Sequence, residues 1–459
     1  MTGRERSLPI ELLAPLALLA LLAGSCAGGG RRAPAPALDP TPPAAAATRQ
    51  ETRQAEIERL TAGSRLGLQE LAWIAELANP DLAAAREDWR AAGGRTRQAG
   101  LYPNPALELE AEDVPAGDPG LGRSKNTIAL SQPLILGGRR AAATSAARAD
   151  EEARGLALEA TRREVLGALR ALFVEILHLE RNAALHVELL EVARRTHAIA
   201  RERFEARAAP EAEAIRAELE VRELELGERR LAHERGALAE RLRALLGGVE
   251  VPLERVAGAL PAELPEIDRA ALGARLRDHH PALAAARARI EAADRRLEEA
   301  RAARVPDLDL RIAYGRDEAE NADIVEAGLR IPLPLFDRNQ GRILEARHLA
   351  QRARREADAL GARLAAELAG AWAAWSIARE EVLVLRDGIV PAAERALAQA
   401  RAGYEAGHTT LLELLDAQRT LTRARLDLEG SARAAHLAEA DLWRLAGPAP
   451  ETPEQAERP

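Results

Sequence analysis

Few side chains in this sequence have the types and the spacing that chemistry requires. The nine histidines are scattered along the chain, and His279 and His280 form the only adjacent pair. Neighbouring residues of a helix point in different directions, so these two imidazoles are poorly placed to bind one metal ion together. The sequence also contains no nucleophile elbow, phosphate-binding loop or metal-hydrolase signature. We therefore expect no enzyme, no resident metal ion and no cofactor.

The one residue with an expected chemical modification is Cys26, the only cysteine of the chain. Arg4 and Arg6 precede an apolar run, Leu12–Ala23, that is too short to span a bilayer. Small residues follow the run directly before Cys26, and this arrangement resembles the lipobox of bacterial lipoproteins. It predicts a lipoprotein signal peptide over residues 1–25 and a lipid attached to Cys26. An ordinary signal peptide with an incidental cysteine is the alternative.

The rest of the chain repeats itself at a spacing of about two hundred residues. Four segments recur in the same order, residues 79–86, 105–109, 130–136 and 204–206 as residues 280–287, 306–310, 329–335 and 404–406. The unit is far longer than a solenoid repeat, so it indicates two copies of one large structural half. We place the halves at residues 51–248 and 268–446, with a connector at 249–267. Proline-rich segments at 26–50 and 447–459 are expected to form an extended tether and a disordered tail.

Each half is expected to contain a helix, two strands, a very long helix, a turn and a further helix. Alanine and leucine alternate with arginine and glutamate in a continuous helical pattern, which favours long helices packed closely side by side. Gly388 and Pro391 are expected to interrupt the long helix of the second half. The strands are predicted at about residues 106–114, 126–133, 307–314 and 324–331.

The four predicted strands share a period-two pattern. In the third strand the apolar residues Leu308, Leu310 and Ile312 alternate with Asp307, Asp309 and Arg311. One face of each strand is therefore apolar and the other is mostly charged. Such strands suit a barrel with lipid outside and a watery lumen inside, although a soluble sheet would show the same alternation. The export signal and the duplicated strand pairs favour the barrel.

The number of strands predicts an assembly. Four strands cannot close around a lumen, and an open sheet edge in hydrocarbon leaves costly unpaired backbone groups. Two chains would give an eight-stranded barrel whose interior is filled by side chains. Three chains would give twelve strands and could leave a pore. The predicted fold is thus mainly α with a small β part: duplicated helix–strand–strand–helix halves, a long coiled-coil helical tunnel, and four strands per chain in a trimeric 12-stranded transmembrane β-barrel. The formal charge of −8 is dispersed, so no nucleic-acid partner is expected.

Several motifs carry a resemblance to a known family. Leu-Ser-Gln-Pro at residues 130–133 precedes Gly-Gly-Arg at 137–139, residues 332–341 read Pro-Leu-Pro-Leu-Phe-Asp-Arg-Asn-Gln-Gly, and residues 404–407 read Tyr-Glu-Ala-Gly. Together with the duplicated halves, these motifs resemble the outer membrane efflux protein family (TolC-like) over about residues 55–446. Their forms are most similar to the CzcC-type branch, which serves heavy-metal efflux pumps.

The resemblance implies a homotrimer in the outer membrane of a Gram-negative bacterium, lipid-anchored and continued by a helical tunnel into the periplasm. It implies the channel component of a tripartite efflux system, through which substrates, heavy-metal cations among them, leave passively. The implied partners are outer membrane lipid, a periplasmic adaptor (membrane fusion) protein and an inner-membrane RND-type transporter. A lipid-anchored periplasmic coiled-coil adaptor or scaffold protein is the alternative, although adaptors usually need compact β domains of their own.

The same resemblance implies a constricted periplasmic entrance lined by Glu413 and Asp416. At i and i+3 these residues share a helix face, and a trimer would gather them into an anionic ring that attracts cations. A solvated helix face is the alternative. Tyr404 resembles a family position that helps to hold the entrance closed, although packing within the bundle would explain it equally. Gly407 is expected to supply the turn where a helix ends, and Arg207 stands at its position in the first half, so the two hairpins need not move alike.

Overall fold

The computed structural model describes residues 43–63, 65–114, 124–261, 263–318 and 320–447. They belong to two compact units, one ending at Glu58 and the other beginning at Arg59. The helix α2 (Pro43–Ala62) begins within the segment predicted as a tether, so residues 43–50 are helical and not extended. Cys26 and the predicted signal peptide lie outside the described residues, as does the predicted tail after Gly447.

The first half of the larger unit is dominated by one very long helix. Its elements are α3 (Leu68–Ala78), α4 (Pro80–Ala99), β1 (Ala106–Glu112), β2 (Lys125–Leu134), α5 (Arg139–Glu205) and α6 (Glu211–Leu245). α5 contains 67 residues, which corresponds to ~100 Å at 1.5 Å per residue. It begins after Gly138, whose φ of 69° lies in the left-handed region that glycine adopts easily. The chain then reverses and returns along α5 as α6.

The second half repeats this order after a connector with a short helix, η3 (Leu253–Arg255). Its elements are α7 (Arg269–His279), α8 (Pro281–Ala302), β3 (Leu308–Asp317), β4 (Ala322–Arg330), α9 (Gln340–Val384), η4 (Leu385–Ile389), α10 (Val390–Glu405) and α11 (Leu411–Ala446). η4 is a single π-helical turn. The predicted interruption at Gly388 and Pro391 is therefore a local widening, because α9 continues through η4 into α10.

The repeat is visible in the first turns of matching helices. The Asn79 side chain accepts hydrogen bonds from two backbone N–H groups at the start of α4. His280 Nδ1 does the same for one N–H group at the start of α8, at 3.2 Å. Pro80 and Pro281 follow these caps, at a position where the missing N–H leaves no helical bond unmade. Both halves thus begin a helix with the same capped proline turn.

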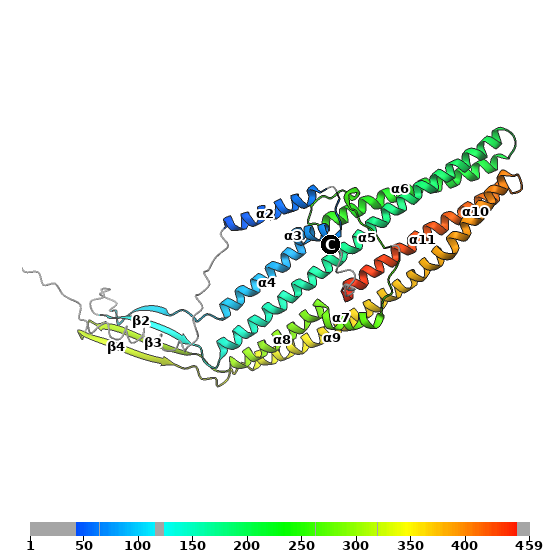
Figure 1. Ribbon diagram of the computed structural model, residues 1–459. Coiled ribbons are helices and arrows are strands. Elements are labelled where there is room, and N and C mark those ends of the chain that lie inside the picture. The colour runs from blue at the N-terminus through cyan, green and yellow to red at the C-terminus, as the bar shows by residue number, and fades with distance from the viewer. Residues whose placement is uncertain (1–42, 64, 115–123, 262, 319, 448–459) are drawn as a thin grey trace, which may run out of the picture. The chain divides into compact units, whose positions relative to one another are not determined.

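The strands form one antiparallel sheet in the order β1-β2-β3-β4. The central pair joins the two halves, since β2 of the first half pairs with β3 of the second. Figure 1 shows this sheet at one end of α4, α5, α8 and α9 within the larger unit. The outer edges of β1 and β4 pair with no other described strand.

α5 is also the centre of the helical packing. It contacts α4, α6, α8 and α11, while α9 packs against α8 and α11. Leu169, Leu172 and Ile176 of α5 are completely buried. Their spacing of three and four residues places them on one helix face, and burial of each contributes about 2–3 kcal/mol.

The outer faces of the helices are charged. Pairs such as Arg222 with Glu218 at 2.5 Å and Arg352 with Glu356 at 2.7 Å lie one turn apart on the same helix. Such exposed pairs contribute only about 0.3–0.5 kcal/mol each. Within the described ranges, no helix is both long and apolar enough to pass through a membrane.

Candidate functional site

The strand register divides the sheet into two faces of opposite character. The apolar face carries Leu107, Leu109, Ile128, Leu130, Leu134, Leu308, Leu310, Ile312, Tyr314, Val325 and Leu329. Leu109 and Val325 on this face are 73% and 66% exposed. An apolar surface of this extent across a whole sheet marks a contact with lipid or with another apolar surface.

The opposite face, here called the polar face, is rich in charge. Its paired residues include six carboxylates and three cations: Glu108, Glu110, Glu112, Asp309, Asp317 and Glu326 against Lys125, Arg311 and Arg330. The net charge of this face is therefore −3 for one chain. Small residues lie between the charged ones, and Ala129 and Ala313 are each only 1% exposed because the long side chains cover them.

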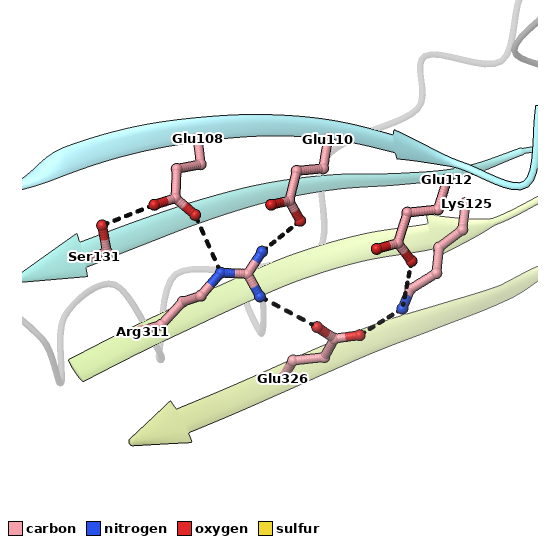
Figure 2. Close-up of polar contacts among 7 residues, drawn as sticks. All are labelled: Glu108, Glu110, Glu112, Lys125, Ser131, Arg311 and Glu326. Atoms are coloured by element: carbon pink, nitrogen blue, oxygen red, sulfur yellow. Dashed lines mark hydrogen bonds and ion pairs between the residues drawn. The ribbon is translucent and has the colours of Figure 1, made fainter. Parts of the chain in front are cut away.

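One arginine links three strands on the polar face. Figure 2 shows the Arg311 guanidinium reaching across β2 to two carboxylates of β1. Its Nε lies 3.2 Å from Glu108 Oε2, and its Nη2 lies 2.5 Å from Glu110 Oε2. On the other side its Nη1 lies 3.5 Å from Glu326 Oε2 on β4. Ser131 donates a hydrogen bond of 3.0 Å to the remaining oxygen of Glu108.

The only lysine of the chain completes this network. Lys125 Nζ lies 2.6 Å from Glu326 Oε1 and 3.7 Å from Glu112 Oε2. The sequence pattern indicated a charged face but not these pairs, because they depend on the register of four strands. The only signal in the sequence was the isolated Lys125 directly before a predicted strand.

The predicted entrance residues lie at the far ends of the helical hairpins. α10 ends at Glu405, and Gly407 adopts a φ of 75° in the turn that follows. The His408 N–H donates to the Gly403 carbonyl oxygen at 2.8 Å, which satisfies an open carbonyl at the helix end. Arg207 adopts the same conformation in the first half, with a φ of 57°. A side chain at this position is strained, since only glycine enters the left-handed region freely.

Glu413 and Asp416 are both exposed at the start of α11. Glu413 belongs to a capping box: its Oε2 accepts a hydrogen bond from the Thr410 N–H at 2.7 Å, and Thr410 Oγ1 accepts one from the Glu413 N–H at 3.3 Å. The buried face of α11 carries Leu414 and Leu415 instead. Both carboxylates thus point away from the packed side of the helix.

Tyr404 does not lie with these carboxylates. It is buried in a cluster that joins the two hairpins and includes Ala200, Ala217, Leu411, Leu414 and Leu415. The Arg203 guanidinium lies 4.7 Å from the centre of its ring, within the range of a cation–π contact. The Tyr404 hydroxyl is buried and has no hydrogen-bond partner among the described residues. Packing between the hairpins is the role that these contacts support.

The first hairpin differs from the second at matching positions. Glu213 stands where Glu413 stands, but one of its carboxylate oxygens is buried without a partner within the described part of the chain. Arg216 replaces Asp416 and is exposed. Only the second hairpin therefore has an exposed carboxylate at both of these positions.

Two polar contacts between the hairpins were not predicted. Arg419 Nε lies 2.6 Å from Glu220 Oε2, and Thr196 Oγ1 donates to Gln418 Oε1 at 3.0 Å. The Glu220 carboxylate raises the pKa of Arg419 through this hydrogen bond. A glutamate on the apolar side of α6, next to Ala217 and Val221, was the available signal. Over the described ranges, no group of three or more histidine, cysteine or acidic side chains is placed to hold a metal ion.

Comparison with known proteins agrees with this architecture. The model of the family described as outer membrane efflux protein matches twice, over residues 71–248 and 272–448. The chain is similar to the cobalt-zinc-cadmium resistance protein CzcC of Cupriavidus metallidurans, with 29% identity over 84% of this chain and 91% of that protein. Its fold is similar to that of a membrane protein from Pseudomonas aeruginosa, with a TM-score of 0.70 and 23% identity over 83% and 90% of the two chains. For the outer membrane protein VceC from Vibrio cholerae the TM-score is 0.67, with 22% identity over 83% and 96%.

These similarities favour the efflux-protein interpretation of the sequence over the adaptor or scaffold alternative. The predicted fold class, mainly α with duplicated helix–strand–strand–helix halves and a small sheet, is confirmed. The relatives are outer membrane efflux proteins and not enzymes, and the alternative of a periplasmic adaptor or scaffold does not fit their family. The family model matches one segment in each half and more than half of the chain in total. The chain therefore belongs to the outer membrane efflux protein family.

Proposed function

We propose that this protein is the outer-membrane channel component of a tripartite efflux system and gives substrates a passive exit. The observation that carries this proposal is the division of the sheet into an exposed apolar face and a charged polar face. A strand with lipid on one side and water on the other needs this division. An inner-membrane RND-type transporter would supply the energy, and a periplasmic adaptor protein would join it to the channel.

A homotrimer follows from the edges of the sheet. The outer edges of β1 and β4 pair with no described strand, and in hydrocarbon such edges leave backbone groups without hydrogen bonds. Three copies joined edge to edge would close twelve strands into a barrel with the polar face inside. The helices offer further surface for neighbouring copies, since Val187, Ile377 and Leu412 are each more than half exposed.

The hairpin tips would form the periplasmic entrance of the trimer. Glu413 and Asp416 are exposed on one side of α11, so three copies would bring six carboxylates around the axis. Gly407 would supply the tip turn, and Tyr404 would hold the second hairpin against the first. The exposed carboxylates would attract cations and resist closure by mutual repulsion.

Attachment to the membrane would have a second component. A lipid on Cys26 would anchor the mature N-terminus in the outer membrane, in addition to the barrel. The support for this is the apolar run and the small residues before Cys26. Mass spectrometry of the purified protein would show the mass of an acylated N-terminal cysteine, and an unmodified residue at that position would contradict the lipid anchor.

The proposed substrates are heavy-metal cations. CzcC, at 29% identity, is a cobalt-zinc-cadmium resistance protein. The net negative polar face and the exposed carboxylates at the tips suit the passage of cations. Deletion of the gene should sensitise the bacterium to divalent metal salts, and sensitivity to organic drugs alone would contradict this substrate class.

Single-channel recording tests the proposed function. The purified protein in a planar bilayer should conduct with a preference for cations. Glu413→Gln combined with Asp416→Asn removes the proposed ring but retains hydrogen-bonding side chains, and should lower that preference. Glu211→Gln, an exposed carboxylate on the first turn of α6, is the matched control. Absence of conductance would contradict the channel, whereas unchanged selectivity in the double variant would contradict the ring.

A further inference from the structure

The apolar surface of the sheet continues beyond the last residue of β4. Ile331, Leu333 and Leu335 keep the alternation of the strand, with a proline between each pair. All three are exposed, Leu333 at 72%, and the next residue, Phe336, is 91% exposed. Proline fixes its φ at a value that suits an extended backbone. A row of apolar side chains therefore reaches from the sheet toward the start of α9.

Hydrogen bonds fix the loop that presents Phe336. The Asn339 side chain donates to the Ala300 carbonyl oxygen of α8 at 2.7 Å, and the Asn339 N–H donates to Asp337 Oδ1 at 2.8 Å. Gln340 of α9 donates through Nε2 to the Phe336 carbonyl oxygen at 3.1 Å. These bonds tie the loop to two helices, so the backbone that carries the exposed ring has a defined position.

A pocket of about 730 Å³ lies beside this loop, between the end of α8 and the start of α9. Four arginines line it: Arg139, Arg296, Arg304 and Arg342. Arg139 is paired with Asp307 at 2.6 Å, and Arg296 is paired with Asp150 at 2.8 Å. Arg304 and Arg342 are exposed and form no ion pair with any described residue. These two guanidinium groups can therefore bind an anion from outside the chain.

The whole end of the sheet next to the helices is basic. Glu299 and Asp337 also line the pocket, so its lining has four positive and two negative charges. The excess of arginine extends over the segments that join helices to strands, which are residues 95–105, 133–142, 299–309 and 330–342. They contain nine arginines and four carboxylates, a net charge of +5, in a chain whose formal charge is −8. This end of the sheet therefore attracts anions although the protein is acidic.

The first half has a matching arrangement at the same end of the sheet. Tyr102, between α4 and β1, is exposed, and the Arg140 guanidinium lies 4.1 Å from the centre of its ring. Leu101 beside it is exposed as well. Aromatic rings and arginines gather where the hydrocarbon of a bilayer meets the headgroups, because each has an apolar part and a polar part. Both halves therefore carry side chains that suit this boundary.

The length of the strands places these side chains at the boundary. β2 and β3 each contain 10 residues, which corresponds to ~33 Å, or to ~25 Å along the membrane normal at a tilt of about 40°. The apolar band of an outer-membrane barrel is about 25 Å tall. In a sheet that spans the outer membrane, the basic segments thus lie at the headgroups of the leaflet next to the helices.

We propose that the pocket binds the phosphate headgroup of an anionic phospholipid, through Arg304 and Arg342, and that Phe336 lies beside its acyl chains. The inference rests on the proposed function, since it requires a sheet that crosses the outer membrane. A phospholipid combines a charge for the two arginines with an apolar part for the exposed ring and leucines. Inorganic phosphate offers only the charge. A second copy joined to the edge of β4 meets backbone groups, whereas these side chains continue a face of the sheet.

Native mass spectrometry of the detergent-extracted assembly tests the charge preference. Dioleoylphosphatidylglycerol is the anionic probe, and dioleoylphosphatidylcholine, with the same acyl chains and no net charge, is the control lipid. The wild type should bind the anionic lipid about tenfold more tightly, because each arginine near the headgroups contributes about a factor of five. Arg304→Gln combined with Arg342→Gln should remove most of this preference.

Arg229→Gln combined with Arg230→Gln is the matched control, since it removes two exposed arginines from α6. It should bind both lipids as the wild type does. Equal affinity of the wild type for the two lipids would overturn the proposal. An equal loss of preference in the two double variants would also overturn it, because the preference would then reflect only the total charge.

Inorganic phosphate and Phe336→Ser separate a lipid site from a site for a free anion. Millimolar phosphate should displace little phosphatidylglycerol, because it makes no contact with the apolar side chains. Phe336→Ser should weaken the binding of both lipids by a similar factor, since the ring contacts acyl chains and not the charge. Full displacement by phosphate together with an unchanged affinity in Phe336→Ser would show a free-anion site and overturn the proposal.

A tryptophan at position 336 reports what lies against the ring. The five native tryptophans all lie in α3, α4, α9 and α11, so the wild type gives the background. In vesicles of the two lipids, Phe336→Trp fluorescence should be quenched more by brominated phosphatidylglycerol than by the same fraction of brominated phosphatidylcholine. Absence of added quenching would show that a neighbouring copy covers this position. That result, or equal quenching by both brominated lipids, would contradict the site.

Conductance in a planar bilayer distinguishes a failure of this site from a failure of the channel. Trimers that conduct ions but show no preference for phosphatidylglycerol would contradict the lipid site alone. A protein that forms neither trimers nor pores would contradict the proposed function, and the lipid site with it.

Discussion

Arg419 of α11 and Glu220 of α6 form an ion pair across 2.6 Å that joins the two helical hairpins of one chain. The Glu220 side chain is 6% exposed, whereas that of Arg419 is 49% exposed. A buried carboxylate with no partner loses its hydration without compensation, so Glu220 depends on Arg419 from the other hairpin. Thr196 of α5 and Gln418, the residue next to Arg419, add a second contact. The hairpins are therefore coupled close to the buried Tyr404 cluster.

Arg419→Ala should destabilise the contact between the hairpins. It leaves the Glu220 carboxylate buried without a partner, which costs about 1–3 kcal/mol. The midpoint of thermal unfolding in detergent should fall accordingly. Arg216→Ala removes an exposed arginine from α6 and should change the stability by less than about 0.5 kcal/mol. Equal shifts in the two variants would show that the ion pair contributes nothing specific.

His280→Asn should make the free energy of unfolding less sensitive to acid pH. Burial, followed by the guanidinium groups of Arg163 and Arg444, lowers the pKa of His280 to about 4. The pKa of an unfolded histidine is about 6.5, so between these two values the unfolded chain binds more protons and the free energy of unfolding falls as the pH falls. Asparagine keeps the helix cap, since Asn79 caps α4 in the first half.

The measurement is thermal or denaturant unfolding at a series of pH values. Between about pH 7 and about pH 4, the free energy of unfolding should fall by about 2–3 kcal/mol less in His280→Asn than in the wild type. Parallel pH profiles for the two proteins would contradict the contribution of His280.

Arg311→Gln should weaken the sheet more than an equal loss of charge elsewhere on the polar face. The substitution removes contacts to Glu108, Glu110 and Glu326 and leaves three carboxylates close together. Arg330→Gln is the matched control, because it changes the charge of the same face by the same amount but Arg330 belongs to none of these pairs. Reversal potentials should shift alike in both variants, whereas heat resistance of the assembly should fall chiefly in Arg311→Gln. Equal heat resistance would argue against a structural role for the network.

Exchanging residues between the two tip turns should change stability in opposite directions. Arg207→Gly removes a side chain from a left-handed conformation and should raise the free energy of unfolding by about 1 kcal/mol. Gly407→Ala introduces the same strain and should lower it by a similar amount, although no atom lies within 4 Å of the added Cβ. Thermal unfolding of the two variants checks both signs. A fall in stability for Arg207→Gly would mean that the arginine side chain stabilises its turn by another contact.

Much of the fold could be predicted because its signals are local. The alternation in the strands and the repeated segments gave the two halves and the two faces of the sheet. The π-helical turn at Gly388 was not predictable, since a glycine followed by a proline more often ends a helix. The role of Glu413 in a capping box has a local signal, because a threonine, Thr410, stands three residues earlier.

Contacts between distant segments were beyond the sequence. His178 and His436 are 258 positions apart, and Arg311 and Glu110 are 201 apart. Neither pair has any local pattern, because each depends on the packing of helices or on the register of four strands. The buried position of Tyr404 likewise follows from how the hairpins pack, which the residues of α10 alone do not specify.

The number of chains in the purified assembly tests the central claim most directly. The claim is that the free edges of β1 and β4 join between copies and enclose water within the outer membrane. Native mass spectrometry of the detergent-extracted mature protein should give three copies, and the same material should form ion-conducting pores in a planar bilayer. A single folded copy that stays in solution without detergent and forms no pores would contradict the account.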